Sequence, residues 1–196
     1  MKTADIQRRL GVAPDGIWGP VTWAALFTFC GCKDARRAKD LGFGANAYLL
    51  GFDISTPLRI AHFMAQAAHE TGGFRWLEEI WGPTLAQMRY EGRRDLGNVK
   101  PGDGQRFKGR GIFQLTGRGN YEDYGKTLGL DLIAHPYLAA DPGNSVLIAG
   151  SYWKRKGLNA LADADNCEKI TRAINGGLNG FPERLAYVER LKGLLL

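Results

Sequence analysis

The stretch that decides the fold is residues 56–74, which read TPLRIAHFMAQAAHETGGF. Thr56 suits a helix N-cap, and Pro57 suits the first helical position. The apolar residues that follow cover a broad face of a helix: Leu58, Ala61, Phe63, Met64, Ala65 and Ala68. A Gly-Gly pair then ends the pattern. The stretch predicts a buried helix that ends at Glu70.

A carboxyl group at the C-terminal end of an apolar helix is hard to ionise. The negative helix end and low-dielectric neighbours both favour the neutral acid, so we expect a raised pKa for Glu70. An acid that keeps its proton near neutral pH can serve as a general acid. The alternative is a surface glutamate at a frayed helix end, and this feature alone does not separate the two.

Two further glutamates, Glu78 and Glu79, follow eight and nine residues after Glu70. In one continuous helix Glu79 would face away from Glu70, because nine steps of about 100° make two and a half turns. The Gly-Gly break removes that restriction and lets the chain fold back across a cleft. Trp76 and Trp81 lie nearby. Their rings can stack on sugar faces, although buried packing is the commoner role of tryptophan.

A second segment, residues 102–121, reads GDGQRFKGRGIFQLTGRGNY. Its glycines allow the backbone to approach a ligand closely. Gln114, Thr116 and Asn120 offer neutral hydrogen-bonding groups that suit sugar hydroxyls, N-acetyl groups or a held water. The segment lacks the GK[ST] sequence and the preceding strand of a nucleotide-binding loop. The alternative is a structural glycine-rich loop.

Composition places the chain among ordinary globular proteins. It has 196 residues, of which 44% are hydrophobic and 23% charged, enough for one medium catalytic domain or that plus a mini-domain. The net charge of +6 favours a polyanionic partner, but the charges are scattered, and we find no aromatic-basic array that predicts nucleic-acid binding.

The cysteines and histidines predict neither a metal site nor another cofactor. Three cysteines occur without a CxxC pair, and three histidines form no HExxH pattern. We expect reduced thiols in a protein made in a cytosol. The first residues lack the apolar core of a signal peptide, and no apolar run is long enough to span a membrane. We therefore expect no stable membrane anchor.

The rest of the chain reads as mainly helical. Residues 3–30 predict two short helices joined by the turn-rich stretch 11–20, and residues 33–50 predict a helix broken at Gly42 and Gly44. Residues 91–111 are expected to be mainly loop. Helices are predicted over three further ranges: 143–156, 167–175 and 182–196. The alternation of apolar and polar residues that is typical of strands is scarce, so we predict a mainly α fold.

The N-terminal residues carry a first family resemblance. The residues are Ile6-Gln7-Arg8-Arg9-Leu10-Gly11, followed by Asp15-Gly16-Ile17-Trp18-Gly19-Pro20-Val21-Thr22. They resemble the peptidoglycan-binding domain of cell-wall hydrolases and span about half of its usual length. We therefore predict a short helical peptidoglycan-binding-like segment over residues 1–34 and a catalytic domain over residues 35–196.

Three ordered motifs carry a second resemblance, to glycoside hydrolase family 19. They are residues 65–74 (AQAAHETGGF), residues 109–117 (GRGIFQLTG, continued by Asn120-Tyr121), and residues 171–177 (TRAINGG, followed by Arg184). The likeness is strongest to the bacteriophage endolysin branch. It implies a lysozyme-like, chitinase-type helical domain with a catalytic cleft, and it covers roughly residues 40–196.

The resemblance also implies roles for individual residues. Glu70 matches the general acid, Glu79 the base that activates water, and Thr116 the position that helps to hold that water. The expected substrate-binding set is Gln114, Asn120, Asn175, Arg184 and Trp81, in which Arg184 also supports the carboxylates. In the endolysins the sequence Asn-Leu-Asn-Tyr usually follows the second glutamate, whereas here Ile-Trp-Gly follows Glu79. Glu78 therefore remains a competing candidate.

The implied activity is an inverting hydrolysis of β-1,4 bonds in bacterial peptidoglycan by a monomeric endolysin that lyses its host. The resemblance further implies synthesis in a host cytoplasm without a signal peptide and release to the wall by a separate membrane-permeabilising protein. Two alternatives remain open. One is a chitinase that acts on chitin, and the other is a non-catalytic wall-binding protein on a degenerate hydrolase fold.

Overall fold

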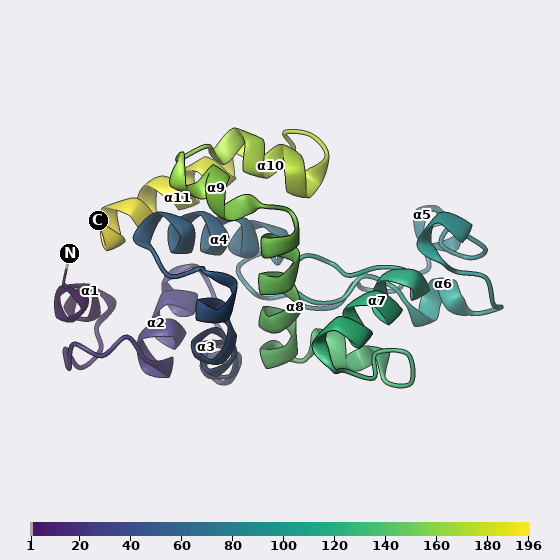
Figure 1. Cartoon of the computed structure of the whole chain (residues 1–196), viewed down its shortest axis with the longest axis horizontal. Coiled ribbons are helices and arrows are strands. Elements are labelled where there is room, and N and C mark those ends of the chain that lie inside the picture. The colour runs from purple at the N-terminus through teal and green to yellow at the C-terminus, as the bar shows by residue number, and fades with distance from the viewer. Residues whose placement is uncertain (1) are drawn as a thin grey trace.

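The computed structural model describes residues 2–196, and in these residues helices make up the whole regular structure (Figure 1). The α-helices are α1 (Thr3–Leu10), α2 (Pro20–Phe29), α3 (Ala35–Tyr48), α4 (Pro57–Glu70), α5 (Leu85–Met88), α6 (Asp103–Arg106), α7 (Arg118–Leu128), α8 (Pro142–Arg155), α9 (Leu158–Asp163), α10 (Cys167–Asn175) and α11 (Phe181–Leu195). The 3₁₀ helices are η1 (Leu49–Phe52), η2 (Arg94–Leu96) and η3 (Pro136–Ala140). The predicted mainly α fold is confirmed.

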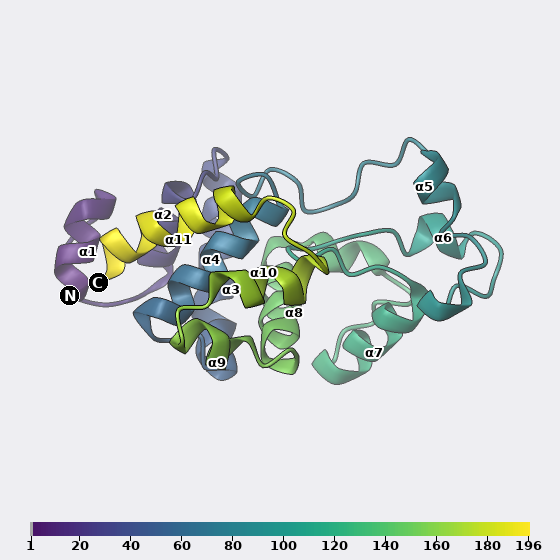
Figure 2. The same ribbon diagram turned by 90° about the horizontal axis from the view of Figure 1, so that it is seen from above.

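The large lobe consists of α1–α4 and α8–α11, packed around one hydrophobic core. Helix α4 runs through its centre, and every residue from Ile60 to Ala68 is buried. Helix α11 lies along α4, while α3 packs against both α2 and α8 (Figure 2). The core is filled by large side chains from several helices, including Phe27, Leu41, Phe63, Trp153 and Leu191.

The small lobe consists of α5–α7 and their connecting loops, and it extends from α8 at the end of the molecule opposite the two termini (Figures 1 and 2). It has its own core, built from Phe107, Leu115, Tyr121, Tyr124 and Leu132. Antiparallel bridges, Glu78 to Arg110 and Arg110 to Leu115, tie its long loops together. The loops that carry the predicted motifs are thereby held against one another.

The N-terminal helices form as predicted on either side of a turn-rich stretch. The buried Gln7 side chain ties this stretch together, because its Nε2 donates to Asp15 Oδ1 at 2.7 Å, to the Ile17 carbonyl at 3.0 Å and to Thr22 Oγ1 at 3.0 Å. Trp23 is among the residues of α1 and α2 that enter the large-lobe core. The boundary between residues 34 and 35 stays a prediction.

The predicted break at Gly42 and Gly44 is wrong, because α3 runs unbroken through both. A Cβ atom at Gly42 would lie 2.7 Å from the Pro20 carbonyl oxygen and 2.8 Å from the Ala24 nitrogen of α2. A Cβ atom at Gly44 would lie 2.9 Å from the Gly143 Cα of α8. These glycines let helices approach closely, and the core that results outweighs their low helix propensity.

The helices expected over residues 143–156, 167–175 and 182–196 appear as α8, α10 and α11. The predicted loop over residues 91–111 is interrupted by η2 and by the single helical turn of α6. None of the helices in residues 2–196 is long and apolar enough to cross a membrane.

Candidate active site

Glu70 is the last residue of α4, as the sequence predicted. Thr56 Oγ1 caps the start of the helix by accepting from the Arg59 nitrogen at 3.3 Å. At the other end Gly72 and Gly73 adopt positive φ values of 58° and 72°, which turn the chain away. The Glu70 side chain is 21% exposed, so its carboxylate reaches solvent at the rim of the large lobe.

A buried arginine contacts this carboxylate. Arg184 lies in the first turn of α11, and its side chain is 1% exposed. Its Nη2 donates to Glu70 Oε1 at 2.5 Å, its Nη1 donates to Gln66 Oε1, and its Nε donates to the Asn179 carbonyl at 3.2 Å. Arg184 was expected both to contact the substrate and to support the carboxylates. The structure places it behind Glu70, enclosed and hydrogen-bonded to that carboxylate.

Two opposing effects act on the negative charge of Glu70. The helix terminus destabilises a negative charge on Glu70, but an adjacent guanidinium stabilises it. The ion pair therefore stabilises the carboxylate that remains once Glu70 has given up a proton.

Glu79 is held by neutral hydrogen-bond donors. Its Oε1 accepts from Gln87 Nε2 at 3.0 Å, and its Oε2 accepts from the Gly109 backbone nitrogen at 3.0 Å. The Glu79 nitrogen in turn donates to the Gly109 carbonyl at 2.9 Å. Burial, together with the nearby Glu79 charge, raises the pKa of Tyr90. Neutral donors orient the Glu79 carboxylate without cancelling its charge.

The neighbouring Glu78 is engaged differently. Its Oε1 accepts from Arg110 Nε at 2.8 Å and lies 3.2 Å from Lys108 Nζ. Partial burial opposes ionisation of Glu78, but the hydrogen bonds and charges of these two cations outweigh it and lower its pKa. Glu78 is thus a structural ion-pair partner across the loops, whereas Glu79 has no cationic hydrogen-bond partner within residues 2–196.

Gln114 and Glu79 converge on one glycine. A Cβ atom at Gly109 would lie 2.5 Å from Gln114 Oε1 and 3.3 Å from Glu79 Oε2. Gln114 itself has a φ of 50°, which is strained for a residue with a side chain, and its Nε2 donates to the Gly111 carbonyl at 2.9 Å. The glycine-rich segment therefore brings the predicted second motif against the second carboxylate.

An open hollow of about 460 Å³ lies between α7 and α8. Its lining includes the three polar residues predicted from the second motif, Gln114, Thr116 and Asn120, together with Tyr152 of α8. Burial, with smaller contributions from the charges of Tyr124 and Glu70, raises the pKa of Tyr152 to about 12. Gln114 joins this hollow to Glu79, because both side chains lie against Gly109.

The Thr116 hydroxyl is already oriented. It donates to the Gln114 carbonyl at 2.8 Å, and Asn120 Nδ2 donates to the Thr116 carbonyl at 2.7 Å. Because the hydroxyl proton is used, the Thr116 oxygen presents its lone pairs to a ligand or water. Both side chains are accessible from the hollow that they line.

Two other predicted residues lie outside that lining. Trp81 lines a separate hollow with Gln87 and Gln105, and its ring centroid lies 6.4 Å from that of Tyr90. Asn175 is the exposed last residue of α10. Neither is brought against Gln114 or Thr116 by the contacts of this structure.

Sequence reasoning did not single out Gln87 or Gln66. Gln87 is 5% exposed, and its Oε1 accepts from the Gly82 and Thr84 nitrogens at 3.1 and 2.8 Å. The signal was present, since Thr84-Leu85-Ala86-Gln87 is a capping-box sequence. Gln66 gave no comparable signal, because its partner Arg184 lies 118 residues away along the chain.

In residues 2–196 no group of three or more histidine, cysteine or acidic side chains is arranged to hold a metal ion. Cys30, Cys32 and Cys167 are buried thiols without disulfide bonds. Glu70 ends α4 and Glu79 lies in the loop that follows, and a pair of carboxylates is the equipment for acid–base chemistry on a glycan.

The fold and the family to which the chain matches define a glycosidase. The chitinase class I family model matches residues 38–160. The chain therefore belongs to glycoside hydrolase family 19, whose members hydrolyse glycosidic bonds.

Relatives and solved structures agree with this assignment. A glycosyl hydrolase family 19 domain-containing protein of Haemophilus influenzae is 36% identical over 151 residues, which are 63% of this chain and 74% of that protein. The acidic 27 kDa endochitinase of Solanum lycopersicum is 36% identical over 132 residues, or 66% of this chain and 46% of its own length. The chain thus spans less than half of that plant relative.

The structure of chitinase C from Streptomyces griseus is similar across both lobes. It superposes with a TM-score of 0.71 at 26% identity, covering 92% of this chain and 95% of that one. The class IV chitinase of Zea mays gives a TM-score of 0.67 at 21% identity, which shows a shared fold.

Proposed function

We propose that the protein hydrolyses the β-1,4 glycan strands of bacterial peptidoglycan by an inverting mechanism, with Glu70 as acid and Glu79 as base. The observation that carries the proposal is the contrast between adjacent carboxylates. Glu79 is oriented by the neutral donors Gln87 and Gly109, whereas Glu78 is paired with Arg110 and Lys108. A general base needs free lone pairs and enough basicity to take up a proton, and the two cations reduce both in Glu78, so Glu79 fits the role better.

The proposed reaction is a single displacement. Glu70 transfers its proton to the glycosidic oxygen as the bond to the anomeric carbon breaks, and Arg184 stabilises the carboxylate that remains. A water attacks the anomeric carbon from the opposite face, giving one proton to Glu79 and directing the other toward Thr116 Oγ1. Such inversion needs carboxyl groups about 6.5–9.5 Å apart, which leaves room for the water.

The polar residues of the second motif would hold the sugar. Gln114 and Asn120 line the hollow with groups that can donate to and accept from hydroxyl and acetamide groups. Tyr152 adds an aromatic surface from α8. Asn175 and Trp81 would contact parts of the substrate that lie farther from the reacting bond.

Peptidoglycan is favoured over chitin by the N-terminal wall-binding-like sequence and by the net charge of +6, which suits an anionic wall. Chitin is the second candidate, since several relatives are named endochitinases. Mass spectrometry of both polymers after digestion tests the choice. MurNAc or GlcNAc reducing ends from peptidoglycan would support the proposal, whereas reducing ends from chitin alone would favour a chitinase.

The catalytic part of the proposal is tested with Glu70→Gln. This change keeps the shape of the side chain but removes its transferable proton, so we expect hydrolysis of peptidoglycan to be abolished. Wall binding serves as the control for folding. A Glu70→Gln protein that still cleaves the glycan would overturn the assignment of the acid.

The proposed biological role is that of a monomeric endolysin made in a host cytoplasm. A separate membrane-permeabilising protein would give it access to the wall, as in the endolysins that the sequence resembles. Expression in bacteria with and without a permeabilising agent tests this. We expect lysis to require both the agent and Glu70, and lysis without the agent would contradict the proposed route of release.

A further inference from the structure

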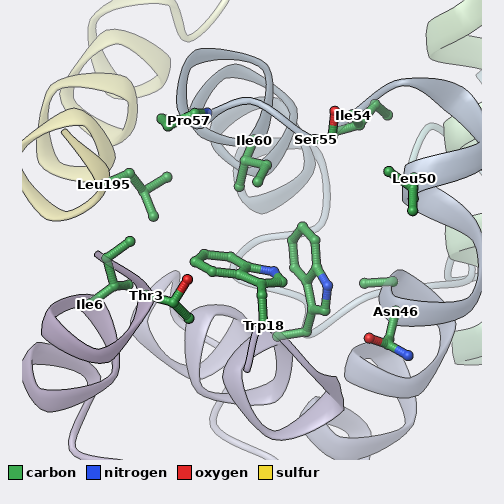
Figure 3. Close-up of a pocket in the computed structure, with 12 residues that line it drawn as sticks. Thr3, Ile6, Trp18, Asn46, Leu50, Ile54, Ser55, Pro57, Ile60 and Leu195 are labelled. Carbon is green, nitrogen blue, oxygen red and sulfur yellow. The ribbon is translucent and has the colours of Figure 1, made fainter. Parts of the chain in front are cut away.

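A third hollow, of about 380 Å³, lies at the end of α4 opposite Glu70. Since α4 rises about 1.5 Å per residue, Pro57 and Glu70 are separated by about 20 Å. Figure 3 shows the labelled residues arranged around Trp18, with Thr3 and Ile6 on one side, Asn46 and Leu50 on the other, and Ile60 facing them. We call this hollow the Trp18 groove.

The Trp18 groove is formed jointly by the N-terminal helices and the large lobe. Trp18 comes from the turn between α1 and α2, Asn46 from α3, and Ile60 from α4. The rings of Trp18 and Trp23 meet edge to face, with centroids 5.4 Å apart and an interplanar angle of 86°. This contact gives the groove an aromatic wall.

The chemistry of the lining is neutral throughout. Among its residues there is no aspartate, glutamate, lysine, arginine or histidine. Three polar side chains stand on the rim, those of Thr3, Asn46 and Ser55, and none makes a hydrogen bond within residues 2–196. A phosphate or carboxylate would find no countercharge here, so a neutral ligand is favoured.

One buried donor in the lining also has no partner. Trp18 Nε1 is enclosed and has no hydrogen-bond acceptor in the described part of the chain. A buried polar group without a partner is uncommon in folded proteins and calls for an explanation such as a ligand. An acceptor oxygen entering the groove would supply it after a small rotation of the indole.

We propose that the Trp18 groove binds a neutral N-acetylated hexosamine unit of the glycan that the catalytic cleft cleaves. A pyranose ring offers a C–H face for an indole, and its hydroxyl and acetamide groups match the amide and hydroxyl groups of Asn46 and Ser55. The inference rests on the proposed glycan substrate. It makes the protein bivalent toward one polymer, with two sites joined rigidly by α4.

The test uses the Glu70→Gln protein, so that N-acetylglucosamine oligomers are bound without being cleaved. The indole N–H resonance of Trp18 and the side-chain amide resonance of Gln114 report separately on the groove and the cleft. We expect both to shift on titration with the oligomer. In Ser55→Trp, where a bulky ring fills the groove, the Gln114 signal should still shift and the Trp18 signal should not.

The outcomes separate the groove from the proposed function. If Gln114 responds and Trp18 does not, the groove proposal fails while the catalytic proposal stands. If neither responds, the groove proposal fails, and digestion of peptidoglycan by the active protein decides the proposed function separately. A second measurement is retention on insoluble peptidoglycan, which we expect Ser55→Trp to lower about tenfold through loss of bivalency.

The matched control is Thr28→Trp, which places the same ring at an exposed position of α2 outside the groove lining. This variant should retain wild-type binding. The single variant Ser55→Trp, which retains Glu70, should hydrolyse short soluble oligomers at the wild-type rate. This measurement checks that the variant folds. Equal retention of Ser55→Trp and Thr28→Trp on the insoluble polymer would overturn the proposal that the groove binds the glycan.

Discussion

The guanidinium of Arg184 lies 2.5 Å from the carboxylate of Glu70, measured from Nη2 to Oε1, although 114 residues separate the two along the chain. This contact joins the end of α4 to the first turn of α11. Because Arg184 is enclosed and also binds Gln66, the acid is held by the body of the large lobe rather than by its own loop.

Arg184→Lys should lower kcat while leaving substrate binding close to wild type. Lysine keeps the charge but cannot bind Glu70 and Gln66 together through a planar fork. Arg184→Ala should in addition reduce the free energy of unfolding by about 3 kcal/mol, because it breaks a buried charged pair. Reducing-end kinetics and urea denaturation measure the two effects. Wild-type kcat in Arg184→Lys would contradict the positioning role.

Glu79→Gln should reduce kcat by a factor of about 10²–10⁴, the usual contribution of a general base. Glu78→Gln should leave kcat close to wild type, because Glu78 pairs with Arg110 and Lys108. Its effect should appear in stability as a loss of about 1 kcal/mol or less, since the side chain is 43% exposed. The reverse ranking of the two variants would identify Glu78 as the base.

Gln87→Ala should lower kcat about tenfold. The variant removes the donor to Glu79 Oε1, and the ionised base then loses a stabilising hydrogen bond. Gln105→Ala, at an exposed position in the same lobe, is the control. A fall in folded fraction with an unchanged kcat per folded molecule would mean that Gln87 only supports the loop.

Gly42→Ala should destabilise the protein by about 1–3 kcal/mol even though alanine favours helices. Its Cβ would lie 2.7 Å from the Pro20 carbonyl oxygen, so α2 and α3 would have to separate. Gly193→Ala in α11 is the matched comparison, because no atom lies within 4 Å of its Cβ position. That change should stabilise by about 0.5–1 kcal/mol. Thermal or urea denaturation distinguishes the two signs.

Local signals made α4 predictable, whereas contacts between segments far apart in the sequence leave no local signal. Thr56 and Pro57 mark the start of α4, and the two glycines after Glu70 mark its end. The break predicted at Gly42 was wrong because helix propensity is a local property. Glycine is needed at this position because another helix approaches it closely. The same limit applies to the site: the family resemblance implied that Arg184 supports the carboxylates, but its enclosed hydrogen bonds to both Glu70 and Gln66 could not be predicted from local sequence.

The buried His62 should make folding stability depend on pH near neutrality. Burial lowers its pKa, despite the opposing effect of Asp165, whose Oδ1 lies 2.8 Å from Nε2, while Nδ1 has no partner in the described chain. A depressed histidine pKa means that the unfolded chain binds the proton more readily. Its contribution to stability is therefore complete above the unfolded value of about 6.5 and is lost as pH falls through the folded value.

Unfolding free energies measured in urea between pH 8 and pH 5 check this expectation. The slope should approach about 1.4 kcal/mol per pH unit for each histidine proton taken up. His69, whose pKa is also lowered, mainly by burial and then by the Arg184 charge, contributes in the same direction. His62→Gln should therefore reduce the slope without abolishing it, because glutamine can still donate to Asp165 but does not titrate. An unchanged slope in His62→Gln would show that His62 is not the group responsible.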